Sequence, residues 1–421
     1  MMTNRLLRHS LYMSMSAALL AGCGVSQPPV GTPGAVQQSR SLAFAQTEGR
    51  RRQPSSSYAV LWRFGGSPRG PAHPLAGLID LNGTLYGTTF GGGSSANGTV
   101  YAISSTGAKR VLYRFQGGTD GASPRAGLVS MDNKLYGTTF AGGGSGCHQH
   151  GCGTVYSINT AGVETVVYRF TGGSDGESPF AGLLPVNGTL YGTTTYGGGS
   201  GCRYSEGCGT VYRVSPEGSE KVLHRFNGNG EFPTANLIDV KGTLYGTTSE
   251  GGSGCASTGG CGIVYTVSES GSEKVLHRFA GYPDGAHPSA PLIDVGGILY
   301  GTTSSGGTSG SGTIFTITPS GSENVLLSFG GYLGASPKSG LIDIHGKLYG
   351  TTEGGGSHGG GTVYRLTKTG DIVVHNFASG SEGKGPVAPL IEVNGTLYGT
   401  TGHGGERCGQ RGCGTVFSLT P

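Results

Sequence analysis

The sequence predicts an all-β fold built from seven similar four-stranded sheets. Glycine supplies 86 of the 421 residues and charged residues only 12%, a composition that favours turns over helices. The motif LYGTT begins at residues 85, 135, 190, 244, 299, 348 and 397, so a unit of 49 to 55 residues recurs seven times. Four short β-like runs per unit, joined by alternating tight and long connections, describe the blades of a seven-bladed β-propeller.

Each unit carries its four runs in the same order. An aliphatic run comes first and reads LID in four of the seven units, and LYGTT, a G[TI][VI][YF] run and a V-x-x-x-F run follow. In LYGTT the first, third and fifth side chains point to one side and the second and fourth to the other. This alternation predicts a strand with both faces partly buried. A parallel β-helix is the alternative, but its coils are shorter than these units and lack tight antiparallel turns.

The connections within a unit are of two kinds. Two-residue hairpin turns are expected between the first and second runs, where a positive φ favours Asn and Gly, at Asn82-Gly83, Asn133-Lys134, Asn187-Gly188, Lys241-Gly242, Gly296-Gly297, His345-Gly346 and Asn394-Gly395. The third and fourth runs are also joined tightly, as at Thr106-Gly107. In an antiparallel meander these turns fall on one face, so the glycine-rich and inter-blade loops fall on the other.

The two ends of the repeat region indicate how the ring closes. The chain enters the region at Tyr58 to Phe64, a fourth-strand run, and leaves it at Gly414 to Pro421, a third-strand run. The first strand is therefore expected to complete the last blade. We assign residues 58–421 to the propeller.

The N-terminal segment has the features of a secretory leader. A basic start with Arg5 and Arg8 precedes an apolar stretch and then Leu20-Ala21-Gly22-Cys23. These last four residues resemble the lipobox of bacterial lipoproteins, which implies a signal peptide over residues 1–22 and lipidation of Cys23. Gly24 in place of Asp favours the outer membrane by the same resemblance. An uncleaved anchor or an ordinary secretory peptide is the alternative. Residues 23–57 then form the lipidated cysteine and a flexible tether rich in Pro, Gly, Gln and Ser.

The repeats resemble the GloVer tandem repeat of bacterial surface proteins. The motif LYGTT-x-GG-(n)-GTVY carries the resemblance across residues 58–421. The resemblance implies an extracytoplasmic protein and assigns no biochemical role.

Eight cysteines form four close pairs in equivalent glycine-rich loops. The pairs are Cys147 and Cys152, Cys202 and Cys208, Cys255 and Cys261, and Cys408 and Cys413. In an exported protein such pairs indicate disulfides that staple the loops. A metal site at Cys147, His148, His150 and Cys152 is the alternative. It is disfavoured because the other three loops keep the cysteines and lose the histidines, so we expect no metal.

Several other patterns have structural explanations. The fourth-strand arginines Arg63, Arg114, Arg169, Arg225 and Arg278 are expected to pair with acids such as Glu164, Glu220 or Glu273, or to shield an outer edge. The Asp-Gly sequences at Asp120, Asp175 and Asp284 are interpreted as turns, with calcium binding as the alternative. The glycine loops join strand to strand without a helix, which excludes a phosphate-binding loop.

The variable loops hold the candidate binding residues, because binding tends to use variable loops on a rigid scaffold. The candidates are His148, His150, Arg203, Tyr204, His403, Arg407 and Arg411.

We expect a lipid-anchored binding module for an envelope protein or glycan, attached to the membrane through its lipid alone. The formal charge of +4 gives no support to nucleic-acid binding. We expect a monomer, no cofactor and no catalytic residue. A polysaccharide-active hydrolase or lyase, and a purely structural envelope protein, are the alternatives.

Overall fold

A computed structural model describes residues 57–65, 69–144, 147, 150–203, 205–255, 259–367, 370–378, 380–406 and 412–421. The chain divides into Met1–Arg51 and Arg52–Pro421, and everything described belongs to the second unit. The predicted signal peptide and Cys23 lie outside the described residues, as does the predicted tether except for Ser57. Within the described residues no helix has the length and hydropathy needed to span a membrane.

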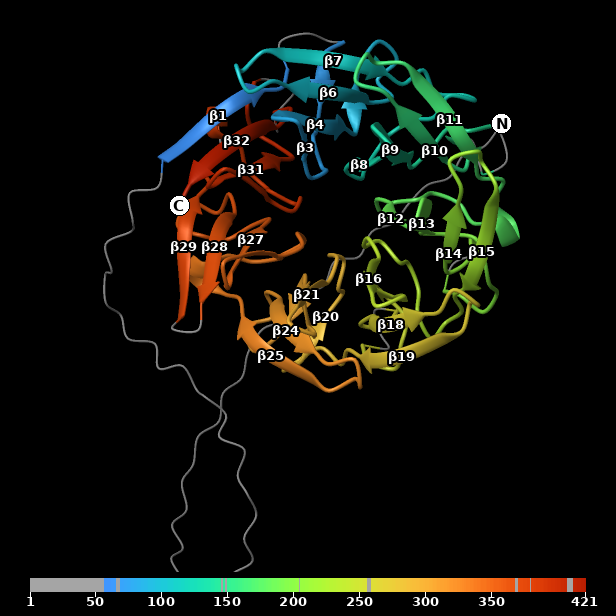
Figure 1. Ribbon diagram of the computed structural model, residues 1–421. Coiled ribbons are helices and arrows are strands. Elements are labelled where there is room, and N and C mark those ends of the chain that lie inside the picture. Colours follow the sequence, from blue (N-terminus) through green and yellow to red (C-terminus); the bar gives the residue numbers. More distant parts are fainter. Residues whose placement is uncertain are drawn as a thin grey trace, which may run out of the picture. The chain divides into compact units, whose positions relative to one another are not determined.

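Seven four-stranded antiparallel sheets form the blades of a β-propeller, as predicted (Figure 1). The first three blades consist of β3 (Ile79–Leu81), β4 (Thr84–Thr89), β6 (Thr99–Ile103) and β7 (Lys109–Arg114); β8 (Val129–Met131), β9 (Lys134–Thr139), β10 (Thr154–Ile158) and β11 (Glu164–Arg169); and β12 (Leu184–Val186), β13 (Thr189–Thr194), β14 (Thr210–Val214) and β15 (Glu220–Arg225). The next three consist of β16 (Ile238–Val240), β17 (Thr243–Thr248), β18 (Ile263–Val267) and β19 (Glu273–Arg278); β21 (Ile293–Val295), β22 (Ile298–Thr303), β24 (Thr313–Ile317) and β25 (Glu323–Ser328); and β26 (Ile342–Ile344), β27 (Lys347–Thr352), β28 (Thr362–Thr367) and β29 (Gly370–Asn376).

The seventh blade joins the two ends of the repeat region, which confirms the predicted closure. It consists of β30 (Ile391–Val393), β31 (Thr396–Thr401), β32 (Thr415–Thr420) and β1 (Ser57–Arg63). β1 pairs antiparallel with β32, with Ala59 opposite Ser418. Figure 1 shows blue β1 beside red β32, with the short first strands inside and the fourth strands outside.

The remaining elements are short and lie in the long connections. β2 (Pro71–Ala72) pairs with β5 (Gly91–Gly92), and β20 (Gly285–Ala286) pairs with β23 (Ser305–Gly306). Among the described residues, the 3-10 turns η2 (Gly173–Asp175), η4 (Gly331–Leu333) and η5 (Gly380–Glu382) lie between blades. Longer helices are disfavoured in a chain so rich in glycine, because each glycine in a helix costs about 1 kcal/mol relative to alanine.

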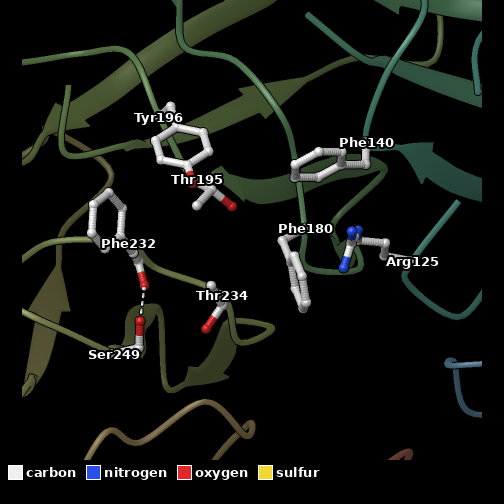
Figure 2. Close-up of a pocket in the computed structure, with 8 residues that line it drawn as sticks. All are labelled: Arg125, Phe140, Phe180, Thr195, Tyr196, Phe232, Thr234 and Ser249. Atoms are coloured by element: carbon white, nitrogen blue, oxygen red, sulfur yellow. Dashed lines mark hydrogen bonds between the residues drawn. The ribbon is translucent and has the colours of Figure 1, made fainter. Parts of the chain in front are cut away.

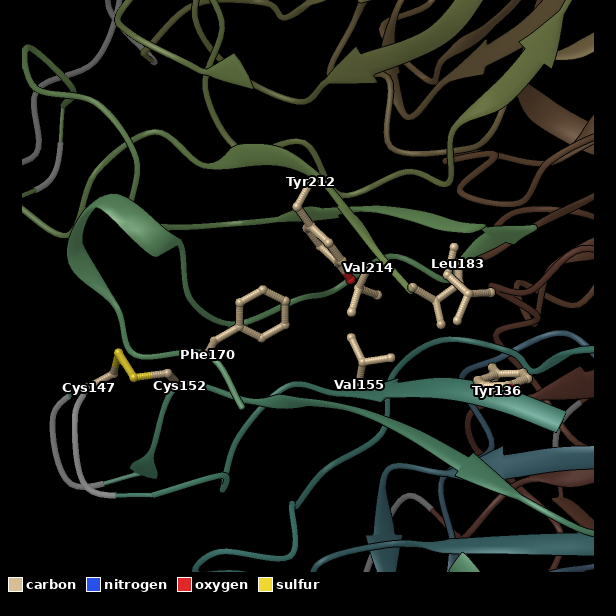
Figure 3. Packing of buried hydrophobic residues seen from close by; sticks show 9 residues of the cluster. Tyr136, Cys147, Cys152, Val155, Phe170, Leu183, Tyr212 and Val214 are labelled. Carbon is tan, nitrogen blue, oxygen red and sulfur yellow. A yellow bond between two sulfur atoms is a disulfide. The ribbon is translucent and has the colours of Figure 1, made fainter. Parts of the chain in front are cut away.

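The hydrophobic core lies between neighbouring blades. One cluster combines Val155 and Phe170 of the second blade with Tyr212 and Val214 of the third (Figure 3). Corresponding clusters occupy the other blade boundaries. Because each sheet buries both of its faces, LYGTT is buried along almost its whole length in every blade, as the alternation predicted.

The hairpin turns between first and second strands confirm the prediction, with one shift of a residue. Asn82 and Gly83 have φ of 55° and 76°, and Asn187 and Gly188 have φ of 49° and 76°. In the second blade the turn is Asp132-Asn133, with φ of 50° and 59°, so placing it at Asn133-Lys134 was wrong. Lys134 instead begins β9. Asp and Asn both tolerate the left-handed region, so the turn needs no glycine.

Candidate binding site on the long-loop face

The chain crosses between blades on the face that carries the long loops, defined here as the long-loop face. Each crossover contains a proline, and the residue before it has a positive φ. These residues are His73, Ser123, Ser178, Phe232, His287 and Ser336, with φ of 55° to 59°, and Gly385 with φ of 66°. A residue before proline normally adopts an extended conformation, so the surrounding contacts must hold this one.

Main-chain hydrogen bonds hold the residue before each crossover proline in place and connect neighbouring blades. The N–H of Ser178 donates to the carbonyl of Cys152 in the second blade at 2.7 Å, and its carbonyl accepts from the N–H of Thr195 in the third at 3.1 Å. The same two bonds recur at all seven crossovers. The fold therefore fixes two side-chain positions in every blade, the residue after the proline and the residue after LYGTT.

These two positions vary from blade to blade and change in character around the ring. After the proline stand Leu75, Arg125, Phe180, Thr234, Ser289, Lys338 and Val387. After LYGTT stand Phe90, Phe140, Thr195, Ser249, Ser304, Glu353 and Gly402. Aromatic side chains therefore gather on the first three blades, whereas the others carry small, polar or charged ones.

A pocket of about 300 Å³ lies where the second, third and fourth blades meet on this face (Figure 2). Its lining consists of Arg125, Phe140, Phe180, Thr195, Tyr196, Phe232, Thr234 and Ser249. Its volume is at the lower end of the range of small-molecule sites.

Two aromatic pairs form opposite sides of the pocket. Phe140 and Phe180 pack edge to face with ring centroids 6.3 Å apart, and Tyr196 and Phe232 do so at 5.3 Å. Figure 2 shows Thr195 and Thr234 between the two pairs, with Arg125 beside Phe180. Edge-to-face packing is a favoured arrangement of aromatic rings and contributes about 0.5–1.5 kcal/mol per pair beyond the burial of area.

Arg125 lies among three phenylalanine rings. Its guanidinium carbon is 4.5 Å from the ring centroid of Phe90, 4.6 Å from that of Phe140 and 5.0 Å from that of Phe180. Among the described residues no carboxylate forms an ion pair with it, and its buried Nε has no hydrogen-bond partner. Burial lowers the pKa of Arg125, although the side chain keeps its charge at neutral pH.

Two hydroxyl groups of the same pocket also have no hydrogen-bond partner among the residues that the structure describes. Thr195 is only 6% exposed, and neither its Oγ1 nor the buried Oγ1 of Thr234 forms a hydrogen bond within the described part of the chain. The Ser249 hydroxyl, by contrast, donates to the carbonyl of Phe232 at 3.2 Å. Because buried polar groups are normally satisfied, three unsatisfied groups in one pocket indicate a place for a polar ligand.

The equivalent positions of the sixth blade hold an ordinary ion pair. Lys338 follows the crossover proline and Glu353 follows LYGTT, and their Nζ and Oε2 atoms are 2.7 Å apart. In the second blade these positions hold Arg125 and Phe140. At equivalent positions, Lys338 is thus paired with a carboxylate, whereas Arg125 is surrounded by rings.

Three of the seven predicted binding residues are described, and they lie in three different blades. His150 is exposed in the loop before β10, and His403 follows β31 with its ring 5.9 Å from that of His73. Arg203 of the third blade forms an ion pair with Glu250 of the fourth, at 3.5 Å. His148, Tyr204, Arg407 and Arg411 lie outside the described residues. The binding role of all seven stays a prediction.

Three of the predicted disulfides are present. They join Cys147 to Cys152, Cys202 to Cys208 and Cys255 to Cys261, with Cα atoms 4.9, 5.4 and 5.2 Å apart. Cys408 lies outside the described residues. The bridge between Cys147 and Cys152 staples its glycine-rich loop, as expected.

The recurring arginines at the ends of the outer strands bind main-chain carbonyl groups. The Nε of Arg169 donates to the carbonyl of Thr119 and that of Arg225 to the carbonyl of Ser174, both at 2.9 Å. Among the described residues neither arginine forms an ion pair with Glu164 or Glu220, although the charges of Arg169 and Arg225 favour the ionised forms of these two carboxyl groups. These exposed side chains each tie the fourth strand of one blade to the crossover loop that precedes it.

The aspartates of the Asp-Gly sequences cap their own turns. Asp175 accepts from the N–H of Thr171 at 2.7 Å and from the hydroxyl of Tyr168 at 2.8 Å. In the fourth blade His277 replaces this tyrosine and lies 3.1 Å from Asp284, near Glu323. Since tyrosine and histidine occupy the same place, we interpret the cluster as a link between outer strands.

Sequence reasoning missed the pocket residues and favoured the longer loops instead. A signal was available in the internal repeats, because the residues after LYGTT and after the crossover proline vary beside nearly constant neighbours. Phe90 and Phe140, which follow LYGTT in the first two repeats, are part of this variation. That these positions meet around Arg125 depends on the crossover geometry.

Comparisons with known proteins bear on the repeat and the fold. The model of the Gloeobacter/Verrucomicrobia repeat matches residues 50–260 and 253–421. No curated protein sequence shows significant similarity to the chain.

Solved structures with a similar arrangement have low sequence identity. A putative 6-phosphogluconolactonase from Bacteroides uniformis has a TM-score of 0.46 and 15% identity, covering 71% of this chain and 85% of its own. A gluconolactonase from Xanthomonas campestris has 0.41 and 16%, covering 71% and 87%. An aldose sugar dehydrogenase from Streptomyces coelicolor has 0.43 and 15%, covering 87% and 98%. Likeness at this level carries no argument about activity.

The repeat match spans every blade of the propeller. Its two segments also include the LYGTT strands and the crossovers that frame the pocket. The chain therefore belongs to the Gloeobacter/Verrucomicrobia repeat family.

Proposed function

We propose that this protein is a saccharide-binding module of the cell envelope and that the pocket on the long-loop face is its binding site. The observation that carries the proposal is the combination of aromatic walls with three buried polar atoms, on Arg125, Thr195 and Thr234, that have no hydrogen-bond partner in the described part of the chain.

This combination matches the two-sided chemistry of a sugar ring. The C–H faces of a pyranose stack on aromatic rings, and its hydroxyl groups donate and accept hydrogen bonds around the edge. Phe180 and Tyr196 offer ring surface, and the hydroxyls of Thr195 and Thr234 can each donate or accept. A ligand that satisfies these buried groups recovers the free energy that their desolvation costs.

A polysaccharide hydrolase or lyase is the second candidate. Glycoside hydrolysis normally uses two carboxylates that flank the scissile bond, whereas the described lining of this pocket contains only Arg125 as an ionisable group besides the phenol of Tyr196. Release of reducing ends from a bound polysaccharide would favour the enzyme. A purely structural envelope protein would bind no saccharide.

The module acts at the envelope, anchored through a lipidated Cys23, as a monomer that contacts the membrane through its lipid and does not bind nucleic acid. The basic and apolar leader followed by Leu20-Ala21-Gly22-Cys23 supports this placement. Metabolic labelling with palmitate should tag the wild type and leave Cys23→Ala unlabelled, with the variant released from the membrane fraction. Equal labelling of the two would contradict the lipid anchor.

The binding proposal is tested by replacing one aromatic wall. Phe180→Ala removes a ring from the pocket, whereas Val387→Ala changes the equivalent position of the seventh blade, away from it. On a glycan array followed by calorimetry, we expect Phe180→Ala to lower the affinity about tenfold or more, which corresponds to about 1.4 kcal/mol, and Val387→Ala to bind as the wild type does. Equal losses in both variants, or no loss in Phe180→Ala, would rule out this pocket.

A further inference from the structure

We propose that Arg125 makes the pocket selective for acidic saccharides, with its guanidinium binding the carboxylate of a uronic acid residue. The inference rests on the proposed function and specifies its ligand class.

Arg125 is held by ring contacts and not by hydrogen bonds or an ion pair among the described residues. The guanidinium carbon of Arg125 lies 4.5 to 5.0 Å from the centroids of three phenylalanine rings. Such cation–π contacts hold the guanidinium without using its N–H donors. Guanidinium carries five donors in a planar fork that matches a carboxylate. The buried Nε of Arg125 has no hydrogen-bond partner among the described residues. Arg125 is therefore positioned as a fork for a planar anion.

In the sixth blade, the two positions equivalent to Arg125 and Phe140 hold a cation and its own carboxylate. There the position after LYGTT is Glu353, and its carboxylate lies 2.7 Å from the Nζ of Lys338. The second blade keeps a cation at the first position and has Phe140 at the second. Half-buried cations without a counter-ion are costly. A ligand carboxylate would occupy the electrostatic role that Glu353 has in its own blade.

The neighbouring groups match the rest of such a ligand. Thr195 and Thr234 lie between Arg125 and the second aromatic pair, Tyr196 and Phe232 (Figure 2). A uronic acid residue carries its carboxylate on the carbon next to the ring oxygen and its hydroxyls on the remaining edge. With the carboxylate at Arg125, those hydroxyls can face the two threonines while a neighbouring sugar stacks toward Tyr196.

The test compares an oligogalacturonate with its methyl ester, which keeps the sugar and removes the charge. The proteins are the wild type, Arg125→Gln and Phe140→Glu, with Lys338→Gln as the matched control outside the pocket. Phe140→Glu places a carboxylate where Glu353 stands in the sixth blade, so it should occupy Arg125 internally. Circular dichroism and thermal unfolding establish that each variant is folded, and calorimetry measures the ratio of the two affinities.

We expect the wild type and Lys338→Gln to prefer the free acid about tenfold or more, and the preference to fall toward one in Arg125→Gln and Phe140→Glu. Equal affinity of the wild type for acid and ester would overturn the inference and leave saccharide binding standing. Binding of neither oligosaccharide would overturn the inference for uronates, and binding of no saccharide on the glycan array would overturn the proposed function itself. Comparable binding of phenylacetate, a carboxylate without a sugar, would keep the role of Arg125 in binding an anion and remove the saccharide.

Discussion

Single residues of LYGTT have separate and identifiable tasks. An added Cβ at Gly192 would lie 2.5 Å from the Oη of Tyr212 on the neighbouring strand, so this glycine makes room for a fully buried ring. The first threonine reaches the next blade, as Thr138 does by donating to the carbonyl of Ala181 at 3.0 Å. The second bonds within the blade, as Thr139 does with Thr154 at 2.8 Å. The motif recurs because every blade must meet the same packing needs.

Replacing Tyr212 with Phe should leave stability unchanged or raise it by about 1 kcal/mol. The hydroxyl of Tyr212 is buried and has no hydrogen-bond partner among the described residues, and burial raises its pKa, so the group remains a neutral phenol. Phe315 and Phe417 already occupy the equivalent position in two other blades. Denaturant unfolding measures the change, with Gly192→Ala as a variant that should destabilise by about 1–3 kcal/mol through overpacking. A marked loss of stability in Tyr212→Phe would show that the hydroxyl has a partner.

Half-buried carboxyl groups lie between the outer strands of neighbouring blades. Glu220 at the start of β15 lies near Asp175 of the preceding crossover, which binds Tyr168 of β11. Burial, together with the charge of Asp175, raises the pKa of Glu220 to about 7. Burial and Asp120 likewise raise the pKa of Glu164 to about 7. Glu164 and Glu220 therefore change their charge within the physiological pH range.

Glu220→Gln should increase stability above pH 7 and have little effect near pH 4.5. The folded state holds a proton on Glu220 up to about pH 7, whereas the ordinary pKa of the group is 4.5. Because the folded state binds more protons in this window, the contribution of Glu220 to the free energy of unfolding falls as the pH rises through it. Glutamine mimics the neutral acid at every pH.

The measurement is the difference in melting temperature between variant and wild type from pH 4.5 to 8.5. Glu217→Gln, at an exposed position in the turn of the same hairpin, makes the same change in net charge and serves as the control. A difference that stays flat across the range in Glu220→Gln would contradict the raised pKa.

The propeller as a whole is closed by its two ends. β1 supplies the outer strand of the last blade, and Thr400 of that blade donates to the carbonyl of Ala76 in the first at 3.1 Å. Phe64 is fully buried in the cluster that joins these two blades. A ring of blades that each bury two faces leaves an exposed apolar face wherever it is open, so closure stabilises every boundary.

A disulfide engineered between Ala59 and Ser418 should form and raise the melting temperature. The two residues are directly opposite in the β1–β32 ladder, and the bridge would enclose nearly the whole ring. On the chain-entropy estimate this stabilises by up to about 6 kcal/mol. The pair Ser57→Cys with Ser418→Cys, two residues out of register, is the control. Mass spectrometry identifies the bridge, and more efficient bridging in the control pair would mean that the register is different.

The sequence by itself determined the blades, their number, their turns and their closure. Strand alternation, Asn-Gly turns and close cysteine pairs are local patterns, and sevenfold repetition strengthens each of them, so a local misplacement such as that of Asn133 changed nothing else. The low helix content follows from the same glycine-rich composition.

The tertiary structure alone decided where the pocket lies. Arg125 is 35 residues from Phe90 in the sequence and 55 from Phe180, and the three meet because left-handed residues before the crossover prolines turn successive blades onto one rim. The residue after LYGTT decides whether the cation after the crossover proline meets a carboxylate or a ring. Lys338 and its partner Glu353, for example, are 15 positions apart in the sequence and meet only in the fold. Repeats reveal what all blades share, whereas a binding site arises where they differ, and only the fold brings those differences together.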